Sequence, residues 1–275
     1  MGHAEKLLRS LCATAEAPLP RSAIVLAHPD DEAVGLGSRL PRLRDALLIH
    51  VTDGSPRDLQ DARAHGFSTR EEYARARGEE VAVALELAGL PPGRRRELGC
   101  VDQEASLSLA ELAREIAGVL REYRPEVVVT HPYEGGHPDH DATAFAVHAA
   151  CRLLEADGVV PPEIVEATSY HNRGGSMAVF EFLPCPGCAP RTVVLSEPER
   201  EFKRRLVSCY RTQQGTLQWF PCEIERFRRA PRYEFTEPPH PGALYYELFP
   251  WGMTGERFRG LAGDALRRLE LGGPL

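Results

Sequence analysis

Two short clusters of histidine and aspartate hold the side chains in this sequence that could do chemistry. Residues 28–32 (HPDDE) directly follow the apolar run at 23–27, and residues 137–141 (HPDHD) follow the β-branched run at 126–130 and a pair of glycines. Imidazole and carboxylate groups suit Zn²⁺ or a similar divalent ion, and a catalytic zinc site has three protein ligands and one position for water. If the fold brings the two clusters together, the sequence predicts one metal site.

The elements expected around these clusters alternate between strands and helices, which is typical of βαβ units in a largely parallel sheet. We expect strands at 23–27, 47–52 and 126–130 with a weaker one before Asp102, and helices at 33–43, 69–90, 107–123 and 142–154. Ligands of such sheets bind at the carboxyl ends of the strands, where both clusters lie. The predicted fold class is α/β, a Rossmann-like and largely parallel sheet with helices on both faces.

Beyond about residue 157 the pattern changes, because proline clusters and shorter apolar runs replace the regular alternation. The sequence predicts added strands at 163–170 and 191–196, a helix at 197–214, and a partly exposed helix or substrate-covering element at 219–229. We predict a single α/β domain, residues 1–275, with a Rossmann-like core at about 20–157 and a C-terminal cap of extra strands and a helix at about 158–275.

The composition argues against other classes of protein. The 33 basic and 40 acidic side chains give a net charge of −7, whereas a nucleic-acid-binding protein normally has a basic excess, so we expect no nucleic-acid partner. No stretch reaches the ~18 consecutive apolar residues of a transmembrane segment. Arg9 interrupts the apolar run near the N-terminus that a signal peptide would keep unbroken. These features predict a cytoplasmic protein.

The seven cysteines are odd in number and mostly scattered, which favours reduced thiols over a disulfide scaffold. Cys185 and Cys188 form a CxxC motif that could hold a structural zinc ion together with Cys209 and Cys222. A zinc ribbon has a second CxxC motif, and this sequence has none. A reversible disulfide or an ordinary proline-glycine loop is the better interpretation of this motif.

The two histidine motifs together resemble those of the LmbE-like deacetylases, the family of the GlcNAc-phosphatidylinositol de-N-acetylase (PIG-L). The run AHPDDE at 27–32 is followed about a hundred residues later by HPDH at 137–140. Three further segments fit the same family pattern: Thr52-Asp53-Gly54, the helical pattern from Arg77 through Glu80 to Gly89, and Lys203 with Tyr210-Arg211-Thr212-Gln213. The resemblance covers roughly residues 22–214.

The resemblance implies a Rossmann-like, zinc-dependent amide hydrolase that removes an acetyl group from an N-acetylglucosamine-type sugar in a small molecule. By motif position the metal ligands would be His28, Asp31 and His140. Fe²⁺, Co²⁺ or Mn²⁺ also suits two histidines and one aspartate, so the ligands alone do not select the metal. Because members of the family often form oligomers, the resemblance also leaves a homo-oligomer open.

The resemblance also assigns roles beyond the metal. Asp30 would be the general base, His137 would face the substrate carbonyl, and Arg77 and Asp102 stand where the sugar-thiol members contact their substrate. From the chemistry alone, a protonated His137 could stabilise the tetrahedral oxyanion. We expect Asp139 to act beside it, holding the histidine in one tautomer and raising its pKa by its charge.

Two other interpretations compete with a hydrolase. Gly35 and Gly37 follow the first strand, as in a nucleotide- or SAM-binding Rossmann protein, but Leu40 occupies the last glycine position of the GxGxxG pattern. The second is a metal-binding protein without hydrolase activity, which would need neither Asp30 nor His137.

Three further polar residues have weaker interpretations. We expect His131 to lie outside the metal ligands and His148 to be structural. Glu32 would either favour the start of the next helix or support the metal ligands from behind.

Overall fold

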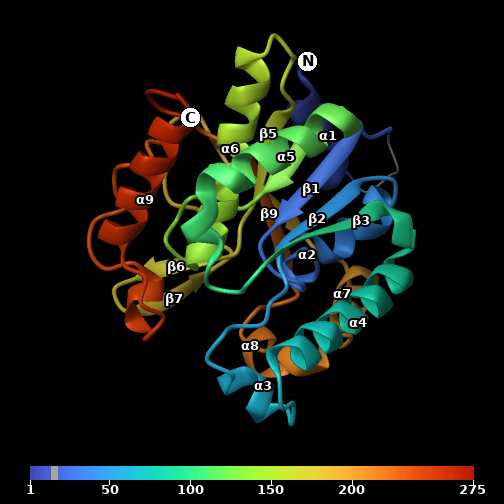
Figure 1. The fold of residues 1–275 in the computed structure, drawn as a ribbon. Coiled ribbons are helices and arrows are strands. Elements are labelled where there is room, and N and C mark those ends of the chain that lie inside the picture. The colour runs from blue at the N-terminus through green and yellow to red at the C-terminus, as the bar shows by residue number, and fades with distance from the viewer. Residues whose placement is uncertain (14–17) are drawn as a thin grey trace.

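The structure is a computed structural model that describes residues 1–13 and 18–275. A seven-stranded sheet runs through the molecule (Figure 1). Its strand order is β3-β2-β1-β4-β5-β9-β8. The five strands β3, β2, β1, β4 and β5 are parallel to one another, and β9 is antiparallel to both β5 and β8. The strands are β1 (Ser22–Leu26), β2 (Leu47–Thr52), β3 (Arg95–Cys100), β4 (Val127–Thr130), β5 (Glu163–Ala167), β8 (Arg191–Val194) and β9 (Ile224–Arg229). The predicted α/β class with a largely parallel sheet is confirmed.

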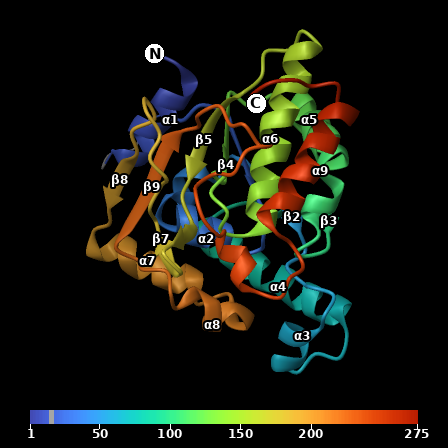
Figure 2. The ribbon, with the colours of Figure 1, turned by 90° about the vertical axis from the view of Figure 1, so that its left-hand side faces the viewer.

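Helices cover both faces of this sheet (Figure 2). One layer consists of α5 (Leu109–Tyr123), α6 (Pro138–Ala156) and α9 (Gly255–Arg268), and the other of α1 (His3–Cys12), α2 (Asp31–Leu36), α4 (Arg70–Ala88) and α7 (Glu197–Val207). In β1, Ala23 and Val25 pack against the first layer, whereas Ile24 and Leu26 pack against the second. Since successive side chains of a strand point to opposite faces, a strand covered on both faces is apolar throughout.

The remaining elements are short and lie mostly around the ends of the strands. β6 (Tyr170–Arg173) and β7 (Ser176–Val179) form an antiparallel hairpin apart from the main sheet. The short helices are η1 (Gly37–Leu43), α3 (Gln60–Ala64), η2 (Pro92–Arg94), η3 (Ala105–Ser108), η4 (Arg211–Gln213), α8 (Gln214–Leu217) and η5 (Tyr245–Leu248).

Several predicted elements match the structure, and others differ at their ends. The strand expected at 47–52 is β2 residue for residue. The helix expected at 33–43 is α2 followed by the 3₁₀ helix η1, which contains Pro41 and therefore lacks one backbone donor. The helix expected at 197–214 stops at Val207, and η4 and α8 follow as separate turns.

The helix expected within 219–229 is wrong, because residues 224–229 form the strand β9 between β5 and β8. Glu225 and Phe227 are buried on one face of the strand, and Arg228 is buried on the other face. A buried strand is normally recognised by apolar side chains. Here two of the three buried positions are charged residues whose partners lie far away in the sequence, so the strand pattern is hidden.

The segment predicted as a cap shares the main sheet with the segment predicted as a core, since β5, β9 and β8 continue the order that begins with β3. The single domain over residues 1–275 stays a prediction, which this shared sheet supports. Among the described residues no helix has the length and apolar character needed to cross a membrane.

The buried pair of Lys203 and Glu225 gives a test of this packing. Lys203 Nζ lies 3.2 Å from Glu225 Oε1 and donates to the carbonyl of Val34 at 2.8 Å. We expect Lys203→Ala to lower the free energy of unfolding by about 3–5 kcal/mol, because it leaves the Glu225 carboxylate buried without its cation. Urea denaturation measures this change. Arg204→Ala is the control, since that side chain is exposed, and a loss below about 1 kcal/mol for Lys203→Ala would contradict the argument.

Candidate active site

The two predicted clusters meet at the carboxyl ends of the neighbouring strands β1 and β4. Residues 28–32 lead from β1 into α2, and residues 137–141 lead into and begin α6. The structure brings all the predicted site residues except Asp139 to the wall of one cavity, which is lined by His28, Asp30, Asp31, Arg77, Asp102, His137 and His140 among others. Asp139 lies directly behind this wall and is fully buried.

The three predicted metal ligands form a compact triangle of ligand atoms. His28 Nδ1 lies 3.2 Å from His140 Nε2 and 3.3 Å from Asp31 Oδ2, and His140 Nε2 lies 3.2 Å from Asp31 Oδ1. A tetrahedral zinc ion with ligands at about 2.0–2.1 Å separates neighbouring ligand atoms by about 3.3 Å. The spacing and the donor types of His28, Asp31 and His140 therefore fit a divalent ion.

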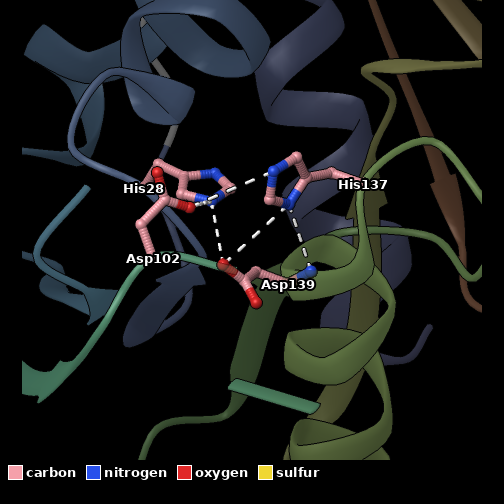
Figure 3. Close-up of side chains that lie close together, drawn as sticks. All are labelled: His28, Asp102, His137 and Asp139. Carbon is pink, nitrogen blue, oxygen red and sulfur yellow. Dashed lines mark hydrogen bonds and ion pairs between the residues drawn. The ribbon is translucent and has the colours of Figure 1, made fainter. Parts of the chain in front are cut away.

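Two carboxylates fix the orientation of His28 from the far side of its ring (Figure 3). His28 Nε2 lies 3.1 Å from Asp102 Oδ1 and is hydrogen-bonded to Asp139 Oδ2 at 3.3 Å. A proton on Nε2 leaves the lone pair of Nδ1 facing the other two ligands. Burial disfavours the charged imidazole, but the carboxylates of Asp102, Asp139 and Asp31 together outweigh it, so the pKa of His28 is raised well above its usual range.

Asp30 has a strained backbone and one charged partner. Its φ of 139° is far from the regions that a non-glycine residue normally occupies. Its carboxylate accepts a hydrogen bond from Arg77 Nη2 at 3.0 Å, and Arg77 also donates to the carbonyls of Pro29 and Gly54, both at 2.7 Å. Burial raises the pKa of Asp30 to about 8 against the opposing charge of Arg77. A carboxylate with a pKa near neutrality is suited to general-base chemistry.

His137 differs from the prediction in its partner and in its pKa. Its Nδ1 accepts the backbone N–H of Asp139 at 3.1 Å, while the Asp139 carboxylate is 3.9 Å away and bonds His28 instead. Burial, helped by the charge of His28, lowers the pKa of His137 well below its usual value, so the expected increase is wrong. A neutral His137 that accepts at Nδ1 must carry its proton on Nε2. It can therefore donate a hydrogen bond without being charged.

The helix that carries the second cluster begins earlier than predicted. α6 starts at Pro138 rather than at 142, with His137 as the N-cap and proline at the first helical position. Asp141, the expected N-cap, instead accepts hydrogen bonds from the backbone N–H groups of Glu134 and Gly135 at 3.2 and 3.0 Å. Asp139 and His140 consequently lie on the first turn of α6, where the helix fixes their directions.

Comparison with known proteins gives the family. The PIG-L family, described as GlcNAc-PI de-N-acetylase, matches residues 23–151. These residues are a PIG-L family domain. A 1D-myo-inositol 2-acetamido-2-deoxy-alpha-D-glucopyranoside deacetylase from Streptomyces avermitilis is 33% identical over 171 residues, which cover 54% of this chain and 58% of the relative. The chain spans 46–60% of the length of the first curated relatives that it matches.

Solved structures resemble most of the fold at low sequence identity. The A40926 pseudoaglycone deacetylase Dbv21 has a TM-score of 0.59 at 20% identity, over 78% of this chain and 98% of that one. The N,N'-diacetylchitobiose deacetylase from Pyrococcus horikoshii has a TM-score of 0.54 at 20% identity, over 82% and 91% of the two chains. These likenesses extend the shared fold beyond the PIG-L domain into the second half of the chain.

Glu32 does more than begin the helix after β1. It is fully buried in the PIG-L domain, where its carboxylate contacts His50 Nε2 at 2.9 Å, the hydroxyl of Tyr210 and the backbone N–H of Asp30 at 3.3 Å. Burial alone would raise the pKa of Glu32, but the neighbouring His50 outweighs it with the help of the Tyr210 hydroxyl, so the pKa of this carboxyl lies below its usual value. Glu32, the last residue of the HPDDE motif, therefore fixes the backbone of Asp30 by accepting its N–H.

His131 lies closer to the ligands than the sequence suggested. Its ring stacks on that of His140 with 4.0 Å between centroids, and its Nε2 lies 3.2 Å from Asp31 Oδ2. It accepts the backbone N–H of Ala27 at 3.0 Å and belongs to neither candidate metal cluster among the described residues. Its position directly after β4 was the sequence signal for a place at the site.

Most of the aromatic side of the cavity was missed, although Phe220 lies in the segment 219–229 that was expected to be a partly exposed helix or a substrate-covering element. Tyr170, Phe220 and Trp251 line this side, and all three come from the chain beyond the PIG-L domain. The sequence offers no motif that marks them, because they come from segments far apart in the chain: Tyr170 from the start of β6, and Phe220 and Trp251 from loops.

The glycines and cysteines singled out in the sequence lie outside this chemistry. A Cβ atom on Gly35 would lie 3.4 Å from the Cβ of Ala167, and one on Gly37 would lie 3.1 Å from Lys203 Cγ. Both glycines thus permit close packing against β5 and α7. All seven cysteines are free, and none belongs to a candidate metal cluster of the described residues.

Removal of one predicted ligand tests the metal site. We expect about one divalent ion per chain in protein purified without chelator, and much less in His140→Ala, because two ligands cannot complete the site. Inductively coupled plasma mass spectrometry measures the content. His65→Ala is the matched control, since that histidine is exposed and lies outside the cavity. Equal metal in His140→Ala and its parent, after zinc titration, would contradict the assignment.

The contact between Asp139 and His28 gives a second test. We expect Asp139→Asn to weaken zinc binding by about 10–100-fold, because the carboxylate that orients His28 and raises its basicity is lost. Competition with a chromophoric chelator measures the affinity. Asp264→Asn, at an exposed position of α9, should leave it unchanged. An Asp139→Asn affinity equal to the parent would show that His28 needs no such support.

Proposed function

We propose that this protein is a metal-dependent N-deacetylase that hydrolyses the acetamide of a small molecule containing an amino sugar. The observation that carries the proposal is the convergence of a His-Asp-His ligand triangle with Asp30 and His137 in one cavity. A protein that only stored a metal would need neither of the last two groups. The names of the curated relatives, which are deacetylases of an acetamido sugar linked to inositol, support the same reaction.

The metal that we propose is zinc, held by His28, Asp31 and His140. A divalent ion bound there would supply a water molecule of lowered pKa and would polarise the substrate carbonyl. Iron, cobalt or manganese in the divalent state suits the same ligands.

Asp30 is the proposed general base. It takes a proton from the attacking water and delivers it to the amine nitrogen as the carbon–nitrogen bond breaks, so that acetate and a free amine leave. A pKa of about 8 for the buried carboxyl favours this exchange in both directions. Arg77 holds this carboxylate in place, since its guanidinium is itself fixed by hydrogen bonds to two backbone carbonyls.

His137 is the proposed donor to the oxyanion of the tetrahedral intermediate. Its Nε2 proton serves this role in the neutral ring, because Nδ1 already accepts the N–H of Asp139. One well-placed donor of this kind is typically worth about 2.7–4 kcal/mol in the transition state. The proposed part of Asp139 is to hold both rings: His137 through its backbone and His28 through its carboxylate.

Arg77 and Asp102 are the proposed contacts to the sugar. Asp102 lines the cavity, and its carboxylate, which also faces His28 Nε2 at 3.1 Å, could accept a hydrogen bond from a substrate hydroxyl. We propose a cytoplasmic location without a nucleic-acid partner, supported by the free cysteines and by the net charge of −7. A homo-oligomer stays a prediction.

Substitution of the proposed base tests the reaction. We expect Asp30→Asn to lower kcat for acetate release from N-acetylglucosamine derivatives by about 10²–10⁴-fold, because proton transfer is lost. Amine release detected with fluorescamine measures the rate, and metal analysis checks that each sample is loaded. Asp58→Asn, an exposed turn residue, is the control. An unchanged kcat for Asp30→Asn at full metal occupancy would overturn the role.

A further inference from the structure

The cavity of the candidate site has two chemically different sides. One side is polar and acidic, built from Asp30, Asp31, Asp61, Arg77, Asp102 and Gln103, all from the first half of the chain. The second side holds the aromatic and apolar residues Tyr170, Leu217, Phe220 and Trp251 next to the polar Ser169, Gln213 and Thr216, all from the second half. A ligand that fills both sides must itself have a polar part and an apolar part.

The apolar side belongs to a continuous row of aromatic rings, which we call the aromatic wall. Each ring of the wall lies 4.6–5.7 Å from the next between centroids, in the order Trp251, Phe249, Tyr245, Tyr170 and Phe220. These separations are those of favourable offset and edge-to-face ring pairs. The wall ends against the reacting groups, since the ring of Trp251 lies 4.8 Å from that of His137.

Part of this wall is open to solvent. Phe249 is 38% exposed, and its neighbour Leu248 is 50% exposed. Trp251 and Phe220 are half-buried, each with some surface toward the cavity. Clustered apolar surface next to a polar cavity is unfavourable in water and is typical of a ligand-binding site.

The origin of the wall separates it from the proposed chemistry. The ligand triangle, Asp30 and His137 lie within residues 23–151, which the PIG-L family covers, whereas every ring of the wall lies beyond residue 151. The wall and the reacting groups are therefore supplied by different segments of the chain, which meet where Trp251 contacts His137 and Tyr170 contacts His140.

We propose that the aromatic wall is a subsite for a flat, apolar, ring-bearing aglycone attached to the amino sugar, with Trp251 and Phe220 as its specificity-determining residues. This inference rests on the proposed function, because it places the acetamide beside His137. The hydroxyls of the sugar then face the acidic side of the cavity, and the aglycone faces the aromatic wall. An aromatic guest adds ring contacts to the burial of area, which an alkyl chain of equal size does not.

The test compares zinc-loaded protein on three glycosides of N-acetylglucosamine with the same anomeric configuration: methyl, n-hexyl and phenyl. We expect the parent to deacetylate the phenyl glycoside with a kcat/KM about tenfold or more above that of the methyl glycoside, through a lower KM. The hexyl glycoside should fall between them. Trp251→Ala and Phe220→Ala should each reduce the phenyl-to-methyl ratio, and Trp251→Phe should restore most of it.

Trp219→Ala is the matched control, because that tryptophan is 64% exposed and does not line the cavity, and its ratio should equal the parent's. A phenyl-to-methyl ratio near one in an active parent would overturn the subsite while leaving the deacetylase proposal intact. A hexyl glycoside as good as the phenyl one would overturn the preference for rings.

If no glycoside is deacetylated, the proposed reaction fails, and binding still decides the subsite. Isothermal titration calorimetry with the same glycosides would then support the aromatic wall if the phenyl glycoside bound more tightly than the methyl one and lost this advantage in Trp251→Ala. Equal affinities would overturn it.

Discussion

The parallel pairing of β1 with β4 is the contact on which the candidate site depends. It joins Ser22 to Val127 and Ile24 to Val129, segments about a hundred residues apart, and thereby sets the loops that follow both strands side by side. A shift of one residue in this register would turn every side chain of β4 to the other helix layer. Both strands are apolar on both faces, so the close packing of their side chains within the two helix layers, rather than an alternating pattern, holds this register. The position of the ligands is thus fixed by packing far from the cavity.

A dense group of buried charges is the second constraint. Asp30, Asp31 and Asp139 are buried and the side chain of Asp102 is 12% exposed, and Arg77 is the one guanidinium among them in the cavity lining of the described chain. Burying so many carboxylates is costly unless each has a partner. The three imidazoles and the backbone N–H groups of Gln103 and Ala105 supply many of those partners, and a divalent cation would complete the balance. The same buried carboxylates that lower the stability of the fold would attract a divalent cation.

The sequence alone was sufficient to predict those features that a short local pattern determines. The continuous apolar runs of β1, β2 and β4 and the two histidine motifs could be identified because each is complete within a few residues. The partner of Asp139 could not, since it depends on how the first turn of α6 aims that carboxylate toward His28 rather than toward its neighbour His137. β9 was missed because Glu225 and Arg228 look like surface residues until their buried partners are known. Nothing in the chain near Trp251 marks its approach to His137, which only the tertiary structure produces.

The architecture also explains how one set of reacting groups can serve different ligands. β5, β9 and β8 continue the sheet past β4, so the second half of the chain is anchored to the same framework as the ligands. The segments that connect and follow these strands then pass over the open end of the cavity, where they contribute Tyr170, Phe220 and Trp251. Loops tolerate substitution better than buried strands do, because few of their side chains are packed on all sides. Substitutions on the aromatic side therefore leave the strands that carry the ligands in place, and they reach the ligands only where rings touch, as between Tyr170 and His140 at 5.6 Å between centroids.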